Sequence, residues 1–299
     1  MSRATGQAPA VRLLGGSQGI VDPSTAWNDT DAETRHEAFS VTKSYTSALV
    51  GIAQDDGDLD IGRKASDYIA DWVGTPYEDV TIRNLLSGDS GLHAPEGFDV
   101  VGAEDATEYG IALNQDDPPG TVWANNEPAI QTLEAVMAKA TGEEPRAYAQ
   151  ERLLDRIGAR DTAMGTDPSG NTYMFWNLQT TCRDAARFGY LFLRNGDWDG
   201  TQVVPDDWVA ESTGRSSQEL NPGYGYLWWL NRTADGSEGD ALVAGARQDM
   251  YWALGAYGQV IQVDPGSETV VVRFGGADAI YDTRAAETTA RIVTDALDP

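Results

Sequence analysis

The stretch Phe39-Ser40-Val41-Thr42-Lys43-Ser44 opens a segment in which apolar and small residues recur at helical spacing. The residues that trace this face are Val41, Tyr45, Ala48, Leu49, Ile52 and Ala53. Gly57 follows the last of them and predicts the end of the helix. A helix that begins at Ser40 places Lys43 one turn later on the same face, so the lysine amine can approach the serine hydroxyl.

This serine and lysine have the chemistry of a nucleophile and its base. The N–H groups of a first helical turn carry partial positive charge, which favours an alkoxide and a developing oxyanion at Ser40. An ammonium group cannot accept a proton, so Lys43 has to be partly desolvated and neutral to act as a base. Phe39, Val41 and Leu49 are expected to bury it. The competing interpretation is an N-cap serine followed by a lysine that faces solvent.

A second serine, Ser17, lies in Gly15-Gly16-Ser17-Gln18-Gly19, which matches the Gly-x-Ser-x-Gly elbow of α/β-hydrolases. That elbow needs a helix that starts at the serine and a histidine far downstream. The residues after Gly19 do not predict a helix, and the two histidines, His36 and His93, lie in the first third of the chain. The sequence therefore favours a hairpin turn at Ser17.

Strand signals lie at the two ends of the chain, and helical signals lie between them. The expected strands are 10–14, 20–21, 224–230, 251–254, 259–263 and 269–274, with a turn at 264–267. The expected helices are 81–86, 127–141, 145–157, 181–194 and about 283–297. We predict an α/β (α+β) fold in which one antiparallel sheet, built from both chain ends, is flanked by helices. Residues 1–299 are expected to form a single domain, with a helical subdomain inserted at about 58–200.

The composition is that of a globular and strongly acidic protein. Of the 299 residues, 41% are apolar and 9 are tryptophan, which is more apolar surface than a disordered chain carries. The 47 acidic and 21 basic residues give a net charge of −26, which disfavours binding to nucleic acid or to an anionic membrane. The acidic residues are scattered along the chain, which is typical of a solvating surface.

The same sequence argues against several kinds of site and location. No stretch reaches the roughly eighteen apolar residues that span a bilayer, and residues 1–20 hold no run of signal-peptide length. We therefore expect a soluble cytoplasmic protein. Cys182 cannot form an internal disulfide and is expected to be a packing residue. Because His36 and His93 lack the spacing of metal ligands, no metal and no other cofactor is expected.

The segment that begins at Phe39 resembles the first motif of the β-lactamase-related serine hydrolases. This superfamily includes class C β-lactamases, D-alanyl-D-alanine peptidases, family VIII esterases and the 6-aminohexanoate-dimer hydrolase. The likeness extends to Phe274 through the segments 48–60, 80–92, 119–123, 130–133, 140–142, 224–229, 255–259 and 263–265. The resemblance implies the fold predicted above, as one catalytic domain, and the hydrolysis of a small ester or linear amide through an acyl-enzyme.

Carried over by position, the resemblance implies that Ser40 is the acylated nucleophile and Lys43 its base. It further implies an oxyanion hole made by the backbone N–H groups of Ser40 and of Ala256, which follows Gly255, with Tyr257 on the same wall. The segment Ala253-Leu254-Gly255 lacks the usual Lys or His of the third motif, which anchors the carboxylate of a β-lactam. This absence favours ester cleavage over β-lactam hydrolysis.

The second motif of the family is altered in this chain. In the family, Pro-Gly-Thr is followed by a Tyr-x-Asn triplet whose phenol shares proton transfer with the lysine, whereas this chain reads Trp123-Ala124-Asn125-Asn126-Glu127. Counting from Pro119 puts Asn125 at the tyrosine position, and matching the triplet itself puts Trp123 there. Neither an amide nor an indole relays a proton at neutral pH.

Three interpretations of this departure are compatible with the sequence. Lys43 acts alone, or a phenol from another segment, such as Tyr109, Tyr224 or Tyr257, reaches the site, or the protein is a relative that binds with little or no turnover. Loss of a general base typically lowers a rate by about 10² to 10⁴. Ester cleavage survives such a loss better than amide cleavage, because the leaving group of an ester needs less help.

Overall fold

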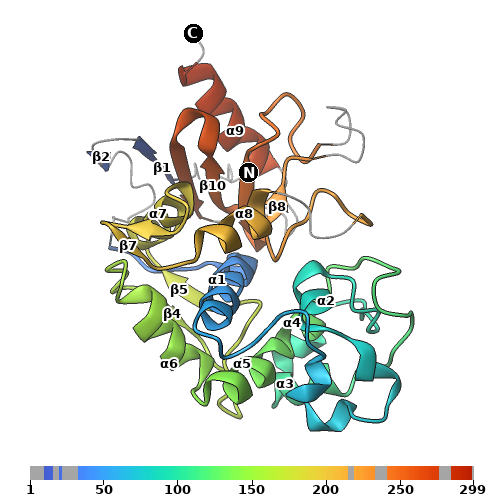
Figure 1. Cartoon of the computed structure of the whole chain (residues 1–299). Coiled ribbons are helices and arrows are strands. Elements are labelled where there is room, and N and C mark those ends of the chain that lie inside the picture. The colour runs from blue at the N-terminus through green and yellow to red at the C-terminus, as the bar shows by residue number, and fades with distance from the viewer. Residues whose placement is uncertain are drawn as a thin grey trace, which may run out of the picture.

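The main sheet joins the two ends of the chain (Figure 1). The structure is a computed structural model that describes residues 10–15, 20–21, 33–214, 219–232, 241–275 and 284–297. The strand order is β2-β1-β11-β10-β9-β8, and each neighbouring pair is antiparallel. These strands are β1 (Ala10–Gly15), β2 (Ile20–Val21), β8 (Trp229–Leu230), β9 (Tyr251–Gly255), β10 (Gln259–Asp264) and β11 (Thr269–Phe274). The predicted sheet from both chain ends is thus confirmed.

Helices cover both faces of this sheet, because successive residues of a strand point to opposite sides. On one face, Ile261 of β10 packs toward α7 (Cys182–Leu193) and belongs to the main core. On the other face, Val260 packs in a smaller cluster with Ala286 of α9 (Arg284–Leu297). The predicted terminal helix therefore covers the sheet.

A mostly helical region lies below the sheet in Figure 1. Its α-helices are α2 (Ile82–Ser87), α3 (Ala106–Ile111), α4 (Glu127–Gln131), α5 (Leu133–Thr141) and α6 (Pro145–Ala149). Its 3₁₀ helices are η2 (Ala65–Asp67), η3 (Ala70–Trp72), η4 (Pro76–Asp79) and η5 (Asp99–Gly102), and α6 continues into the π-helical turn η6 (Gln150–Leu154). The helix expected at 127–141 is divided at Thr132, whose hydroxyl donates to the Ala129 carbonyl at 2.7 Å and so competes with the regular helical pattern.

Other short elements were not indicated by the sequence. They are the sheet of β3 (His36–Glu37), β5 (Leu178–Thr180) and β4 (Ala163–Met164), the hairpin of β6 (Asp197–Trp198) and β7 (Thr201–Gln202), and α8 (Asp206–Gly214). The strand expected at 224–230 was wrong over most of its length, because Leu227 turns the chain with a φ of 60° and donates its N–H to the Leu86 carbonyl. The turn expected at Ser17 and the helix start expected at Thr283 lie outside the described residues.

The helix α1 (Thr42–Asp55) lies between the sheet and the helical region (Figure 1). Every residue from Thr42 to Ala53 is buried, and two of the hydroxyl groups on this helix donate to neighbouring carbonyls. Ser44 Oγ donates to the Leu227 carbonyl at 2.9 Å, and Thr46 Oγ1 donates to the Met174 carbonyl at 2.7 Å. In the part of the chain that the structure covers, no helix is both long enough and apolar enough to cross a membrane.

Candidate active site

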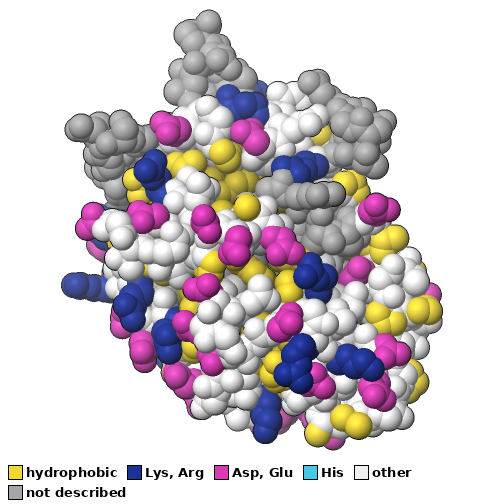
Figure 2. All heavy atoms as spheres, viewed as in Figure 1, with side chains coloured by type: hydrophobic (Ala, Val, Ile, Leu, Met, Phe, Trp, Pro, Cys, Tyr) yellow, Lys and Arg dark blue, Asp and Glu magenta, His cyan; other side chains and the backbone are white. Residues whose placement is uncertain are grey.

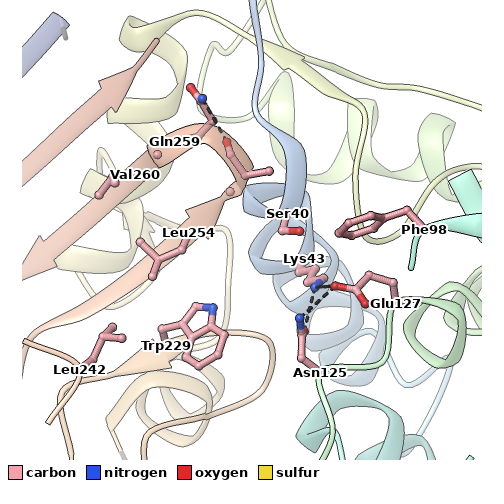
Figure 3. A pocket seen from close by; sticks show the side chains of 13 residues that line it. Ser40, Lys43, Phe98, Asn125, Glu127, Trp229, Leu242, Leu254, Gln259 and Val260 are labelled. Atoms are coloured by element: carbon pink, nitrogen blue, oxygen red, sulfur yellow. Dashed lines mark hydrogen bonds and ion pairs between the residues drawn. The ribbon is translucent and has the colours of Figure 1, made fainter. Parts of the chain in front are cut away.

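A cavity of about 280 Å³ opens where the start of α1, the end of β9 and the loop before α4 meet (Figure 3). The described residues that line it are Ser40, Lys43, Phe98, Asn125, Glu127, Trp229, Leu242, Leu254, Gly255, Ala256, Gly258, Gln259 and Val260. The cavity therefore brings together the first-motif serine and lysine, one of the two candidates for the second-motif position, and the segment after β9.

Ser40 lies on a strained turn at the mouth of α1. It is the second residue of the 3₁₀ helix η1 (Phe39–Val41), so α1 begins two residues later than the sequence predicts. Phe39 has a φ of 50°, a left-handed conformation that is costly for a residue with a side chain and that clusters at functional sites. The N–H of Ser40 belongs to the first turn of η1, where a helix offers no backbone acceptor of its own.

Lys43 is buried and is held by two polar partners. The residue is 5% exposed, and its Nζ donates to Asn125 Oδ1 at 2.9 Å and pairs with Glu127 Oε1 at 3.0 Å. Asn125 Nδ2 donates to the same Glu127 oxygen at 2.9 Å, which closes a triangle of hydrogen bonds (Figure 3). The lysine therefore does not face solvent. Its hydrogen bonds go to Asn125 and Glu127 and not to Ser40 Oγ, which the helical spacing led us to expect as its neighbour.

The two candidates for the second-motif position lie in different surroundings. Asn125, found by counting from Pro119, lies beside Lys43, whereas Trp123 packs edge-on against Tyr224 and Trp229 with ring centroids 5.4 and 6.1 Å apart. Trp123 is thus not among the described residues that line the cavity.

Glu127 is the site residue that the sequence reasoning missed. In the register that puts Asn125 at the tyrosine position, Glu127 stands where the family triplet has its asparagine. Asn126 between them caps α4, because its Oδ1 accepts from the Ala129 N–H at 3.1 Å. Asn125 and Glu127, one on each side of this buried cap, both turn toward Lys43. Their spacing of two residues was the sequence signal that could have identified Glu127.

The three candidate phenols are not among the described residues that line the cavity. Burial, and then the negative charge of Glu127, raise the pKa of Tyr224 well above its usual value, so this phenol stays protonated at neutral pH and cannot act as a base. Tyr109 packs against the main core. The ring of Tyr257 lies against that of Phe39, with centroids 5.2 Å apart.

The segment after β9 forms the wall beside Ser40. A Cβ at Gly255 would lie 2.3 Å from the Ala38 carbonyl oxygen, so glycine is needed for β9 to approach the serine turn this closely. Ala256 is the first residue of the 3₁₀ helix η7 (Ala256–Gly258), so its N–H also lacks an acceptor within the helix. The Gln259 side chain fixes this turn, since it donates to the Ala256 carbonyl at 3.2 Å.

The opposite sides of the cavity differ in polarity (Figure 3). Trp229, Leu242, Leu254 and Val260 form an apolar side, and Lys43, Asn125 and Glu127 form the polar one. Among the lining residues that the structure describes, Lys43 and Glu127 are the charged ones, and they neutralise each other. The site is therefore suited to a neutral ligand with an apolar group.

Comparison with known proteins identifies relatives over most of the chain. The family model described as Beta-lactamase matches residues 15–288. The 6-aminohexanoate-dimer hydrolase of Paenarthrobacter ureafaciens is 22% identical over 274 residues, which cover 81% of this chain and 66% of that enzyme. A beta-lactamase of Providencia stuartii is 26% identical over 141 residues, which cover 47% of this chain and 36% of that protein. The chain thus spans two thirds or less of the length of these two relatives.

Solved structures share the fold at low sequence identity. A beta-lactamase from Mycobacterium bovis superimposes with a TM-score of 0.69 at 19% identity, covering 97% of this chain and 93% of that one. A family VIII carboxylesterase superimposes with a TM-score of 0.73 at 17% identity, covering 96% of this chain and 92% of that one. These likenesses establish the arrangement of helices and sheet that the sequence predicted.

Proposed function

The chain belongs to the beta-lactamase family of serine hydrolases, and from this premise we propose that it cleaves small esters or linear amides through an acyl-enzyme on Ser40. The observation that carries the proposal is the meeting of Ser40, Lys43 and Ala256 around one cavity. The names of the relatives, which include an aminohexanoate-dimer hydrolase and a carboxylesterase, support both substrate classes.

In the proposed reaction, the Ser40 oxygen attacks the carbonyl carbon of the substrate and loses its proton toward Lys43. The N–H groups of Ser40 and Ala256 donate to the oxyanion of the tetrahedral intermediate. Removal of one such donor in other enzymes costs roughly 3 kcal/mol of transition-state stabilisation. The intermediate then expels the alcohol or amine, and water releases the acyl group by the same steps.

The cavity favours an uncharged substrate with an apolar acyl group. Leu254 and Val260 offer apolar contact beside the serine turn, where burial of a methylene contributes about 0.8 kcal/mol. A substrate carboxylate finds no unpaired cation among the described lining residues, because Lys43 is already paired with Glu127. We therefore expect neutral esters to be better substrates than β-lactams or other anionic acyl donors.

The test is the hydrolysis of p-nitrophenyl butyrate by the wild-type protein and by two serine variants. Ser40→Ala is expected to lose at least about 10³-fold in kcat, because it removes the nucleophile. Ser47→Ala is the matched control, since Ser47 lies on the same helix and its buried hydroxyl has no hydrogen-bond partner among the described residues. Equal turnover by Ser40→Ala and the wild type would refute the proposal.

A second candidate function is binding without turnover. It is favoured by the ion pair on Lys43 and by the exclusion of the candidate phenols from the described lining of the cavity. A non-catalytic protein would release no p-nitrophenolate, yet a neutral ester would still bind, as calorimetry would detect. Turnover that depends on Ser40 eliminates this alternative.

A further inference from the structure

We propose that Glu127 is the terminal acceptor of the serine proton, which it receives through Lys43, in place of the phenol that the second motif of this chain lacks. The inference rests on the proposed acyl-enzyme function. It assigns a role in proton transfer to a residue that stands at the asparagine position of the family triplet.

The hydrogen-bond geometry supplies the part of the proton route that runs from Lys43 to Glu127. Glu127 Oε1 and Lys43 Nζ are 3.0 Å apart, and their side chains are 16% and 6% exposed, so the pair is largely shielded from water. The same carboxylate oxygen accepts from Asn125 Nδ2 at 2.9 Å. Asn125 therefore fixes the lysine and the carboxylate relative to each other, but an amide cannot take up a proton itself.

The proton transfer takes place in two coupled steps. Lys43 Nζ gives one proton to Glu127 Oε1, which leaves a carboxylic acid and a neutral amine. The amine then takes the proton of Ser40 Oγ as the serine oxygen forms its bond to the carbonyl carbon, and the electron pair of the C=O bond moves to the oxyanion. The result is an ammonium group at Lys43, a protonated Glu127 and an acyl tetrahedral intermediate on Ser40.

This sequence leaves the charge of the cavity unchanged. Before the attack, the positive Lys43 faces the negative Glu127. After it, the negative charge lies on the oxyanion, while Lys43 is still positive and the shielded carboxyl group is neutral.

The return of the protons completes each half-reaction. The Lys43 ammonium donates to the departing alcohol oxygen or amine nitrogen as its bond to carbon breaks, and Glu127 returns its proton to the amine. In deacylation, water takes the place of the leaving group and gives its proton to the same pair. The charge of Glu127 also acts on the Tyr224 phenol, whose pKa is raised by burial and then by this charge, so the phenol stays protonated during the reaction.

The experiment compares the pH dependence of p-nitrophenyl butyrate hydrolysis in the wild type and in Glu127→Gln. At about pH 7, Glu127→Gln is expected to lose about 10²-fold or more in kcat, because Lys43 then has no group to which it can pass its proton. Its activity is expected to recover at high pH, where hydroxide removes the lysine proton directly. The wild type is expected to be active at about pH 7 already.

Two further variants separate proton transfer from simple positioning. Asn125→Ala removes one hydrogen bond from Lys43 but no carboxylate. It is therefore expected to lower kcat without changing the pH below which activity is lost. The double variant Asn125→Tyr with Glu127→Asn restores the triplet of the family and is expected to regain activity at about pH 7 relative to Glu127→Gln. The melting temperature of each variant checks that it is folded.

Two outcomes would overturn the inference. One is an unchanged rate in Glu127→Gln at about pH 7, and the other is a loss that is equal at every pH, which would make Glu127 a positioning residue only. Rapid-quench measurement of Ser40 acylation distinguishes these from failure of the proposed function. If the wild type forms no acyl-enzyme, the proposed function fails; if the wild type and Glu127→Gln acylate equally fast at about pH 7, only the role of Glu127 fails.

Discussion

Glu134 is a buried carboxyl group on α5 that lies outside the cavity. Its Oε2 accepts a hydrogen bond from Thr107 Oγ1 at 3.3 Å. Burial raises its pKa from 4.5 to about 7, and the charges of Asp167 and Asp105 add to this effect. At neutral pH this buried group is therefore only partly ionised in the folded protein, because its surroundings favour the neutral acid.

This carboxyl group is expected to make stability fall as the pH rises. Between about pH 4.5 and about 7, the folded protein binds a proton at Glu134 that the unfolded chain has released, so the free energy of unfolding decreases through that window. Glu134→Gln keeps a polar group without the charge, and is expected to be more stable than the wild type above pH 7 by up to about 3 kcal/mol. Urea unfolding at about pH 5 and about pH 8 measures the difference. The prediction is contradicted if the free energy of unfolding changes between these two pH values by the same amount in Glu134→Gln and in the wild type.

Asn126 joins the second-motif loop to the rest of the helical region. Its Nδ2 donates to the Leu92 and His93 carbonyls at 3.0 Å each, and its Oδ1 caps α4. Asn126→Ala is expected to reduce the free energy of unfolding by about 1–3 kcal/mol, because it leaves buried carbonyls unpaired. It is also expected to lower kcat, because Asn125 and Glu127 flank the cap.

The matched control for this variant is Asn114→Ala, since Asn114 is an exposed loop residue whose substitution is expected to change stability by less than about 0.5 kcal/mol. Thermal unfolding and ester hydrolysis are measured on both. Wild-type stability in Asn126→Ala would show that the three hydrogen bonds do not hold the loop.

At the scale of single residues, the sequence indicated Ser40 and Lys43 from one helical turn, and it offered Asn125 as one of two candidates from a count along the chain. It did not locate the partner of the lysine. The approach of Glu127 to Lys43 depends on the cap at Asn126 and on the turn of the loop before α4, which bring together groups 84 positions apart. No local pattern carries that information.

Among the secondary-structure elements, α7 makes an unusually close contact with the sheet. A Cβ at Gly189 would lie 2.6 Å from Val270 Cγ1 and 2.9 Å from Ile261 Cγ2. Gly189→Ala is expected to destabilise the protein by about 1–3 kcal/mol, because the helix or the two strands must shift. This loss opposes the gain of up to about 1 kcal/mol that alanine brings in a helix.

The control for this prediction is Gly102→Ala, where the added Cβ would meet nothing within 4 Å. Urea unfolding of both variants gives the comparison. If Gly189→Ala is as stable as the wild type while its helix content is unchanged, the packing account of α7 is wrong.

The longer strands could be predicted from sequence more closely than the shorter ones. β10 and β11 are six-residue runs with turn residues between them, and their observed bounds differ from the predicted ones by at most one residue. The segment 224–230 has the same aromatic composition, but the left-handed Leu227 breaks it, and only two of its residues pair with β9. Whether a short apolar segment forms a strand depends on its tertiary contacts and not on its composition alone.

For the whole molecule, the dominant physical fact is the net charge of −26. Figure 2 shows Asp and Glu side chains spread over the visible face among fewer Lys and Arg. Mutual repulsion of like charges destabilises a compact state, and salt screens it over a distance that falls from about 10 Å at about 0.1 M to about 3 Å at about 1 M.

The melting temperature is therefore expected to rise with potassium chloride from about 0.01 M to about 1 M, most steeply at the lower concentrations, where screening changes most. Scanning calorimetry measures this dependence, and sucrose at matched osmolality is the uncharged control. A melting temperature that is constant or falls over this range would contradict the prediction.

The whole-molecule fold was predictable because the strands of both chain ends and the motifs between them point to one architecture. That architecture supports several hydrolytic activities, so it does not by itself choose a substrate. We propose that the paired charges of Lys43 and Glu127 and the apolar side of the cavity make this choice.

The most direct test of the central claim is intact-mass and peptide mass spectrometry after treatment with a fluorophosphonate. The account predicts one adduct, located on the peptide that contains Ser40, absent in Ser40→Ala and retained in Ser47→Ala. An unmodified Ser40, or an adduct on another residue that persists in Ser40→Ala, would contradict it.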